Sequence, residues 1–216
     1  MKKSGMVYRY IAERVLADRK AKLVVREIAR ELGISPNTVS LAIAPLQRSG
    51  AAAMYLRHFE VTDLSKLLSF WAVTRKLSRD VIYSTYVEMK AASEVEERMP
   101  DGIAYTCCSG YTAMFGNDVS DYSSVYVYAP EYQAREIMGR FPAMEMSKRA
   151  AGHNLFVLKP DPALKIAITE GGLAHSTAPL TQLYVDLWGS GEWYSYEFMI
   201  RLRKRIGDMY GKAILE

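Results

Sequence analysis

Amide, hydroxyl, methyl and guanidinium groups are concentrated on one side of the segment from Pro36 to Arg48. Because a helix turns by about 100° per residue, its inward side would carry Val39, Ala42, Ile43 and Leu46. The outward side and its flanks would carry Asn37, Thr38, Ser40, Leu41 and Arg48. Such groups exchange hydrogen bonds with base-pair edges and contact thymine methyl groups. The spacing therefore favours reading DNA in the major groove, with an ordinary helical hairpin and a solvated face as the alternative.

A glycine turn in front of this segment would position it. Upstream, Val25, Ile28, Ala29 and Leu32 share one helical face. Gly33 can adopt the left-handed conformation that ends a helix. Ser35 is a good N-cap and also a candidate DNA contact, and Pro36 is preorganised for the first helical position. Two short helices joined by a tight glycine turn are typical of a helix-turn-helix.

The flanking segments complete a predicted three-helix domain with a hairpin. An apolar stripe predicts a first helix from about residue 6 to 19. After Gly50, the stretches Ala51–Leu56 and Phe59–Thr62 could pair as a wing, although alanine is a weak strand former. Arg57 and His58 would then lie at the turn and Lys22 in an earlier connection, all three near DNA phosphates. An irregular connector is the alternative to the wing.

Charge is distributed unevenly along the 216 residues. Residues 1–58 hold 11 Lys/Arg and 4 Asp/Glu, a net charge of +7, and residues 59–216 hold 17 and 20, a net charge of −3. A basic segment that coincides with a helix-turn-helix pattern is the electrostatic footprint of a nucleic-acid binder. A basic solvated face without a partner would have to explain that coincidence.

The segment from Leu23 to Gly50 resembles the winged helix-turn-helix of prokaryotic transcriptional regulators. The matching residues are the run Ile28-Ala29-x-x-Leu32-Gly33-Ile34-Ser35, then Thr38-Val39-Ser40, Pro45-Leu46 and Gly50. The resemblance covers about an eighth of the chain and implies binding of double-stranded DNA. Regulators of this kind usually read two half-sites, so we also expect a homodimer.

We predict a mixed α/β (α+β) fold in three parts: a winged helix-turn-helix over residues 1–62, a connecting helix over 63–79 and an α/β C-terminal domain over 80–216. In the connecting helix, Asp63 is the expected N-cap, and the apolar residues are Leu64, Leu67, Leu68 and Trp71. This apolar face could pack on the first domain or form the seam of a dimer. Strands are expected at Val81–Val87, Val125–Ala129, Leu155–Leu158 and Leu164–Ile168, alternating with helices.

One arrangement of residues would suggest catalysis if its spacing were right. Nucleotidyltransferases use a Gly-Ser pair followed by two acids in an Asp-x-Asp pattern that hold Mg²⁺. Here Ser109-Gly110 is reversed, and Asp118 and Asp121 are three apart, where a strand would not place them on one face. The two cysteines are adjacent and the three histidines far apart, which does not suit zinc. We therefore expect no enzyme, no metal and no cofactor.

More loosely, the layout resembles the AbiEi-type antitoxins of type IV toxin–antitoxin systems. The similar stretch runs from Ala178 to Trp188, followed by a helix ending at Leu202-Arg203. This resemblance implies an autorepressor that opposes a nucleotidyltransferase toxin. The alternative is a ligand-sensing regulator whose C-terminal aromatics line a pocket, namely Tyr105, Tyr111, Tyr126, Tyr128, Trp188 and Trp193.

The hydropathy of the sequence indicates where in the cell the protein is expected. No apolar run approaches the ~18 residues of a membrane helix, and no basic-then-apolar leader is present. We therefore expect a cytoplasmic protein without a membrane partner.

Overall fold

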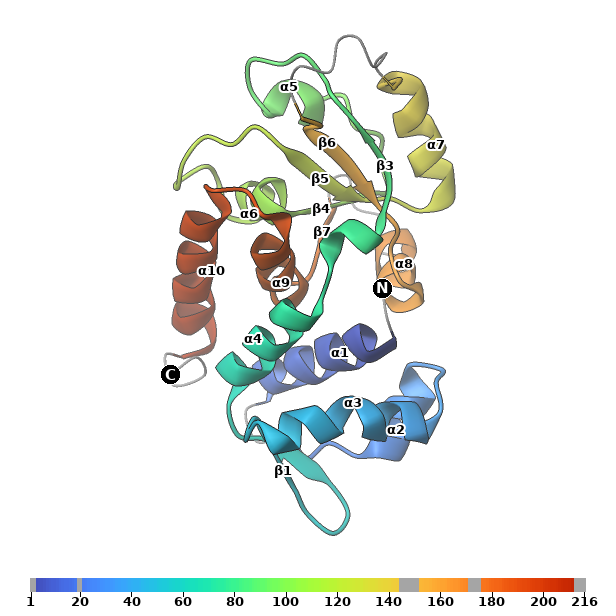
Figure 1. Ribbon diagram of the computed structural model, residues 1–216, viewed down its shortest axis with the longest axis vertical. Coiled ribbons are helices and arrows are strands. Elements are labelled where there is room, and N and C mark those ends of the chain that lie inside the picture. Colours follow the sequence, from blue (N-terminus) through green and yellow to red (C-terminus); the bar gives the residue numbers. More distant parts are fainter. Residues whose placement is uncertain (1–2, 19–20, 144–151, 171–175, 212–216) are drawn as a thin grey trace. The chain divides into compact units, whose positions relative to one another are not determined.

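The computed structural model describes residues 3–18, 21–143, 152–170 and 176–211 (Figure 1). The chain is a mixed α/β protein, as predicted, and it divides into two compact units. The first contains residues 1–75 and 202–216, and the second contains residues 76–201. No helix in the described part of the chain combines the length and the apolar composition needed to cross a bilayer.

The first unit contains three helices, a two-stranded hairpin and a fourth helix. Their bounds are α1 Lys3–Ala17, α2 Val25–Glu31, α3 Pro36–Arg48, β1 Ala52–Met54, β2 Phe59–Val61 and α4 Leu64–Thr74. The strands pair antiparallel, with Ala52 opposite Val61. In Figure 1 the hairpin extends beyond α3, away from α1 and α4.

Local signals in the sequence determine where these helices begin and end. Gly33 has a φ of 62°, so it supplies the left-handed residue after α2. The Ser35 hydroxyl accepts a hydrogen bond from the backbone N–H of Thr38 at 3.2 Å, and Pro36 opens α3. The Asp63 carboxylate likewise accepts from the N–H of Lys66 at 2.8 Å. The predicted boundary residues Gly33, Ser35 and Asp63 are confirmed.

The core of the first unit joins α1, α3 and α4. The Tyr8 hydroxyl donates to the carbonyl of Ala42 at 3.0 Å, and burial raises the pKa of this tyrosine. The Tyr8 ring meets Phe70 edge-on, with centroids 5.8 Å apart. The apolar residues predicted for the connecting helix lie on α4 and are all buried: Leu64, Leu67, Leu68 and Trp71. Packing within the chain therefore accounts for them.

The second unit is built on a five-stranded sheet in the order β3-β6-β5-β4-β7. The pairs β3–β6 and β4–β5 are antiparallel, and β5–β6 and β4–β7 are parallel. Its strands are β3 Val81–Thr85, β4 Ala104–Thr106, β5 Val125–Tyr128, β6 Leu155–Leu158 and β7 Ser176–Thr177. Its helical elements are η1 Leu77–Arg79, α5 Ser93–Glu96, α6 Cys107–Phe115, α7 Glu131–Arg140, α8 Pro162–Glu170, α9 Leu180–Ser190 and α10 Ser195–Tyr210, whose last turns belong to the first unit.

Alternation along β5 shows how the sheet is buried on both faces. Val125 and Val127 join a core cluster that includes residues of α5 and α7. Tyr126 and Tyr128 point to the opposite face, where Tyr126 stacks on Phe156 with centroids 4.4 Å apart. Tyr128 reaches Asp186 on α9. Apolar and aromatic residues therefore fill both layers around the strand.

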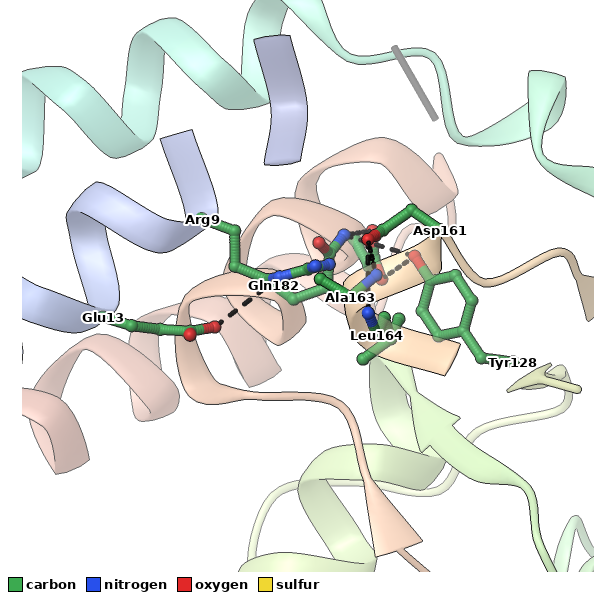
Figure 2. Close-up of polar contacts among 8 residues, drawn as sticks. Arg9, Glu13, Tyr128, Asp161, Ala163, Leu164 and Gln182 are labelled. Atoms are coloured by element: carbon green, nitrogen blue, oxygen red, sulfur yellow. Dashed lines mark hydrogen bonds and ion pairs between the residues drawn. The ribbon is translucent and has the colours of Figure 1, made fainter. Parts of the chain in front are cut away.

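One predicted strand is wrong. The stretch Leu164–Ile168 lies in α8, because Asp161 and Pro162 start a helix in front of it. The Asp161 carboxylate accepts from the backbone N–H groups of Ala163 at 3.1 Å and Leu164 at 3.2 Å, as Figure 2 shows. Leu164 and Ile168 then bury one side of the helix at an i, i+4 spacing.

Gly110 on α6 is required by a close approach of the chain. A Cβ atom at this position would lie 2.8 Å from the carbonyl oxygen of Tyr105 and 2.9 Å from Cδ1 of Leu183. The carbonyl belongs to the backbone and cannot easily move away. The glycine of the Ser109-Gly110 pair therefore has a packing role.

We predict that Gly110→Ala destabilises the protein by about 1–3 kcal/mol, because the added methyl overpacks this contact. Gly139→Ala on α7 is the matched control, since a methyl group added there would have no atom within 4 Å. It should be neutral or stabilising by about 0.5–1 kcal/mol, the usual gain from glycine to alanine within a helix. Urea unfolding measures both, and equal stability of the two variants would contradict the packing role.

Candidate nucleic-acid interface

The outward side of α3 is largely exposed. Asn37, Ser40, Leu41 and Arg48 are exposed, and Thr38 is half-buried. The Leu41 side chain is 67% exposed. The inward side is buried as predicted, through Val39, Ala42, Ile43 and Leu46. The helix contains no acidic residue, so nothing on it repels a polyanion.

Two of the predicted contact residues also build the start of α3. Ser35 accepts from the N–H of Thr38, and the hydroxyls of these two residues lie 2.9 Å apart in a further hydrogen bond. Capping therefore occupies part of their hydrogen-bonding capacity. Asn37, Ser40 and Leu41 are the outward residues near the start of the helix that take no part in this capping.

The β1–β2 hairpin ends in a tight turn with two residues at its apex. The backbone N–H of Tyr55 donates to the carbonyl of His58 at 2.8 Å, which closes the turn around Leu56 and Arg57. Leu56 is 97% exposed and Arg57 is also exposed. The turn thus presents one cation and one apolar side chain to the surroundings.

His58 lies behind this apex and contacts neighbours in the hairpin. Its ring stacks on Tyr55, with centroids 4.9 Å apart and planes at 13°. Its Nε2 atom lies 3.1 Å from Oε1 of Glu60. Since a carboxylate next to the ring opposes the approach of a phosphate, the geometry gives His58 a part in bracing the turn. Arg57 is the better placed of the two for a phosphate.

Further cations adjoin α3 and the hairpin. Lys22 is exposed, and its neighbour Leu23 exchanges two backbone hydrogen bonds with Phe59 of β2, each of 2.9 Å. This bridge fixes Lys22 beside the hairpin. Arg26 and Arg30 are exposed on α2 and were not among the predicted contacts. Their i, i+4 spacing places both arginines on the side of α2 away from its buried residues, and this pattern could have identified them from the sequence.

An acidic residue near the basic surface is already paired. The Glu31 carboxylate accepts from the Tyr10 hydroxyl at 2.7 Å and from the Arg14 guanidinium at 3.1 Å. The hydrogen bond from Tyr10, followed by the contacts of Arg14, lowers the pKa of Glu31. These contacts join α1 to α2 and partly neutralise the carboxylate.

The residues considered for nucleotidyl transfer do not form such a site in the second unit. Ser109 and Gly110 are buried in α6. Asp118 accepts a hydrogen bond from the Tyr111 hydroxyl at 2.9 Å, and Asp121 is exposed. Among the described residues, no three His, Cys, Asp or Glu side chains gather as a metal site would require.

A buried polar network in the second unit was missed by sequence reasoning. Asp186 accepts from Thr106 at 2.8 Å, from Tyr128 at 2.7 Å and, through its other oxygen, from Gln182 at 2.8 Å. Figure 2 shows the Tyr128 and Gln182 side chains meeting. Thr106, Gln182 and Asp186 are fully buried, so the network lies outside the reach of a substrate. The network joins α9 to β4 and β5 within the core, where buried polar groups need hydrogen-bond partners.

The aromatics considered for a ligand pocket separate into two groups. Tyr105, Tyr111, Tyr126 and Tyr128 are buried, and burial is the main cause that raises the pKa of Tyr105 and Tyr126. Trp188 and Trp193 are instead exposed. They line an open groove of about 350 Å³ that also touches Leu187, Glu192, Tyr196 and Met199. The tyrosines therefore fill the core, and the tryptophans mark a surface.

No family model matches the chain, and neither the curated proteins nor the solved structures include a match. Function is therefore inferred from the residues and their placement.

We predict that Ser35→Ala lowers the stability of the protein by about 1 kcal/mol, because α3 loses the acceptor at its N-terminus. Ser35→Asp should retain wild-type stability within a few tenths of a kcal/mol, since aspartate is an equally good N-cap. The midpoint of urea unfolding, followed by circular dichroism, measures both variants. A Ser35→Ala protein as stable as the wild type would show that the cap contributes nothing.

Proposed function

We propose that the chain is a sequence-specific transcription regulator that binds double-stranded DNA through residues 1–62. In this proposal, α1 to α3 with the β1–β2 hairpin form a winged helix-turn-helix. The observation that carries it is the outward side of α3, an exposed strip of amide, hydroxyl, apolar and guanidinium groups without an acid. Occupying a promoter would make such a protein a repressor.

The strip on α3 supports reading in the major groove, which admits one α-helix. Asn37 would pair with adenine, since an asparagine amide matches its N6 and N7 atoms. Leu41, whose side chain is exposed, would contact a thymine methyl group. Arg48 at the last turn would meet a guanine or a phosphate. Ser35 and Thr38 would mainly hold the helix start, while Ser40 offers its hydroxyl to a base edge or to the backbone.

The hairpin and α2 support contact with the DNA backbone. Arg57 at the apex and Lys22 beside the hairpin would neutralise phosphates, together with Arg26 on α2. Each neutralised phosphate releases condensed counterions, so these contacts give affinity and salt dependence. They would position the protein without reading sequence.

The second unit has an unassigned role in this proposal. Its exposed tryptophans line an open groove, and this groove favours contact with a macromolecule over sensing of a small molecule. The antitoxin role is a hypothesis that rests on the domain order, the basic-to-acidic charge split and the resemblance of Ala178–Trp188. In that segment Gln182 and Asp186 face the core, so the similarity concerns folding more than a binding surface.

We predict that Arg57→Ala weakens binding to all duplexes alike and reduces the slope of log K against log salt by about 1, because one phosphate contact is lost. Fluorescence anisotropy of a labelled random-sequence duplex, titrated at several salt concentrations, gives this slope. Arg135→Ala is the control, since Arg135 is also an exposed arginine but lies on α7, outside the proposed DNA-binding residues.

The control should keep the wild-type slope. If Arg57→Ala leaves the slope unchanged, or if Arg135→Ala lowers it as much, the hairpin does not contact phosphates as proposed. A wild-type protein whose binding does not respond to salt would count against DNA binding by this surface altogether.

A further inference from the structure

A contiguous set of large apolar side chains is exposed where α9 ends and α10 begins. Its members, named here the α10 patch, are Trp188, Trp193, Tyr196 and Ile200, exposed by 44%, 79%, 63% and 51%. The three aromatic members line the open groove of about 350 Å³. Tryptophan and tyrosine are the residues that most often dominate the binding energy of protein interfaces. Single exposed leucines are ordinary, but grouped exposed aromatics mark an interaction site.

Two members of the patch lie on one face of α10. Tyr196 and Ile200 are four residues apart on this helix, and Trp193, just before the helix, lines the same groove as Tyr196. Phe198 and Leu202 point to the opposite side and are fully buried, so the helix is already anchored in the chain by its inner face. The exposed face is therefore a second apolar surface, additional to the one that folding uses.

An acidic and a basic side chain flank this face, in an order that would place opposite charges together if two copies of α10 packed antiparallel. Glu197 lies in the first turn of α10, and Arg201 follows one turn later on the same flank. Both are exposed, and within the described part of the chain neither makes an ion pair with a neighbour. If two copies of α10 pack antiparallel about a two-fold axis near Met199, Glu197 of each copy meets Arg201 of the other. A two-fold interface makes every such contact twice.

The exposed apolar area of the α10 patch is large enough for the centre of an interface between two copies. A fully buried aromatic side chain covers about 150–250 Å², so the exposed parts of the three aromatics offer roughly 300–450 Å². A standard interface buries about 800 Å² on each partner, of which the apolar centre is only a part. The aromatics and Ile200 would form that centre, with Glu197 and Arg201 at the polar rim.

We propose that the α10 patch is the seam of a homodimer, occupied by the same patch of a second copy of this chain. The reason that a second copy is useful rests on the proposed function, because two recognition helices read two half-sites. The patch itself does not depend on DNA binding. Dimerisation can therefore be measured without DNA, and its failure would leave the proposed function intact.

The test exchanges the two rim charges and measures mass by sedimentation equilibrium of the full-length chain. The wild type should move with concentration from 24.4 kDa towards twice that mass. Glu197→Arg places two arginines at each contact, and Arg201→Glu places two glutamates there. Each single variant should raise the dissociation constant of the dimer at least about tenfold, since every substituted contact occurs twice.

Mixing the two single variants gives the decisive result. In a mixed dimer, the arginine introduced at position 197 of one copy would face the glutamate introduced at position 201 of the other. The second contact would be the native pair of Glu197 with Arg201, so both contacts would again join opposite charges. Association of the mixture should return close to the wild-type strength. A folding defect in either variant could not be repaired by mixing, so recovery shows contact between copies.

Two further variants separate the patch from general surface effects. Trp193→Ala should abolish the dimer, and Tyr132→Ala should leave it unchanged, since Tyr132 is 75% exposed on α7 and outside the patch. A wild type that stays at 24.4 kDa at every concentration would overturn the proposal. So would a dimer that neither charge change weakens, or single variants whose association mixing fails to restore.

Discussion

The turn between α2 and α3 is the constraint on which the proposed interface depends. Gly33 adopts a left-handed conformation that ordinary residues disfavour, and Ser35 caps α3 two residues later. The turn lets Ile28 and Ala29 pack on one side while Val39 and Ile43 pack from the other. Because the core holds α3 by its inner face and the cap holds its start, the outer face needs no contact within the chain. Because the fold does not require the outer face of α3, this face is free to contact DNA.

Local sequence rules predicted where α3 and α4 begin and where α2 ends, because these signals act over a few residues. Glycine conformation, N-capping and apolar spacing are properties of short segments, and Gly33, Ser35 and Asp63 follow them. The same rules were wrong for Leu164–Ile168, because five apolar-rich residues suit a buried strand as well as one side of a helix. The deciding feature was Asp161 as an N-cap three residues earlier.

Local rules could not predict contacts between residues that are far apart in the sequence. The polar network around Asp186 joins residues up to 80 positions apart, and nothing local marks Thr106 as a partner. The same is true of Gly110, whose glycine is required by a backbone carbonyl five residues earlier and by Leu183 far along the chain. At the candidate interface, the outward residues of α3 followed from helical periodicity. The bracing of His58 by Tyr55 and Glu60 required the folded hairpin.

The two native cysteines make the central claim directly testable. Cys107 and Cys108 are buried, and burial raises the pKa of the Cys108 thiol to about 12, so native thiols should react slowly at neutral pH. A cysteine placed at Leu41 on α3 could therefore carry an iron–EDTA group that cuts nearby DNA. We would bind this protein to duplexes that the wild type enriches from a random-sequence pool and map the cuts.

If the outer face of α3 reads DNA, the cuts should cluster within a few base pairs of one place in the enriched sequence. The same reagent at Val73→Cys should give no such cluster, because Val73 is 69% exposed on α4, a helix that Figure 1 places on the other side of α1 from α3. Uniform cutting by the Leu41→Cys protein while it is bound, or equal clusters from both positions, would contradict the claim that the outer face of α3 reads DNA.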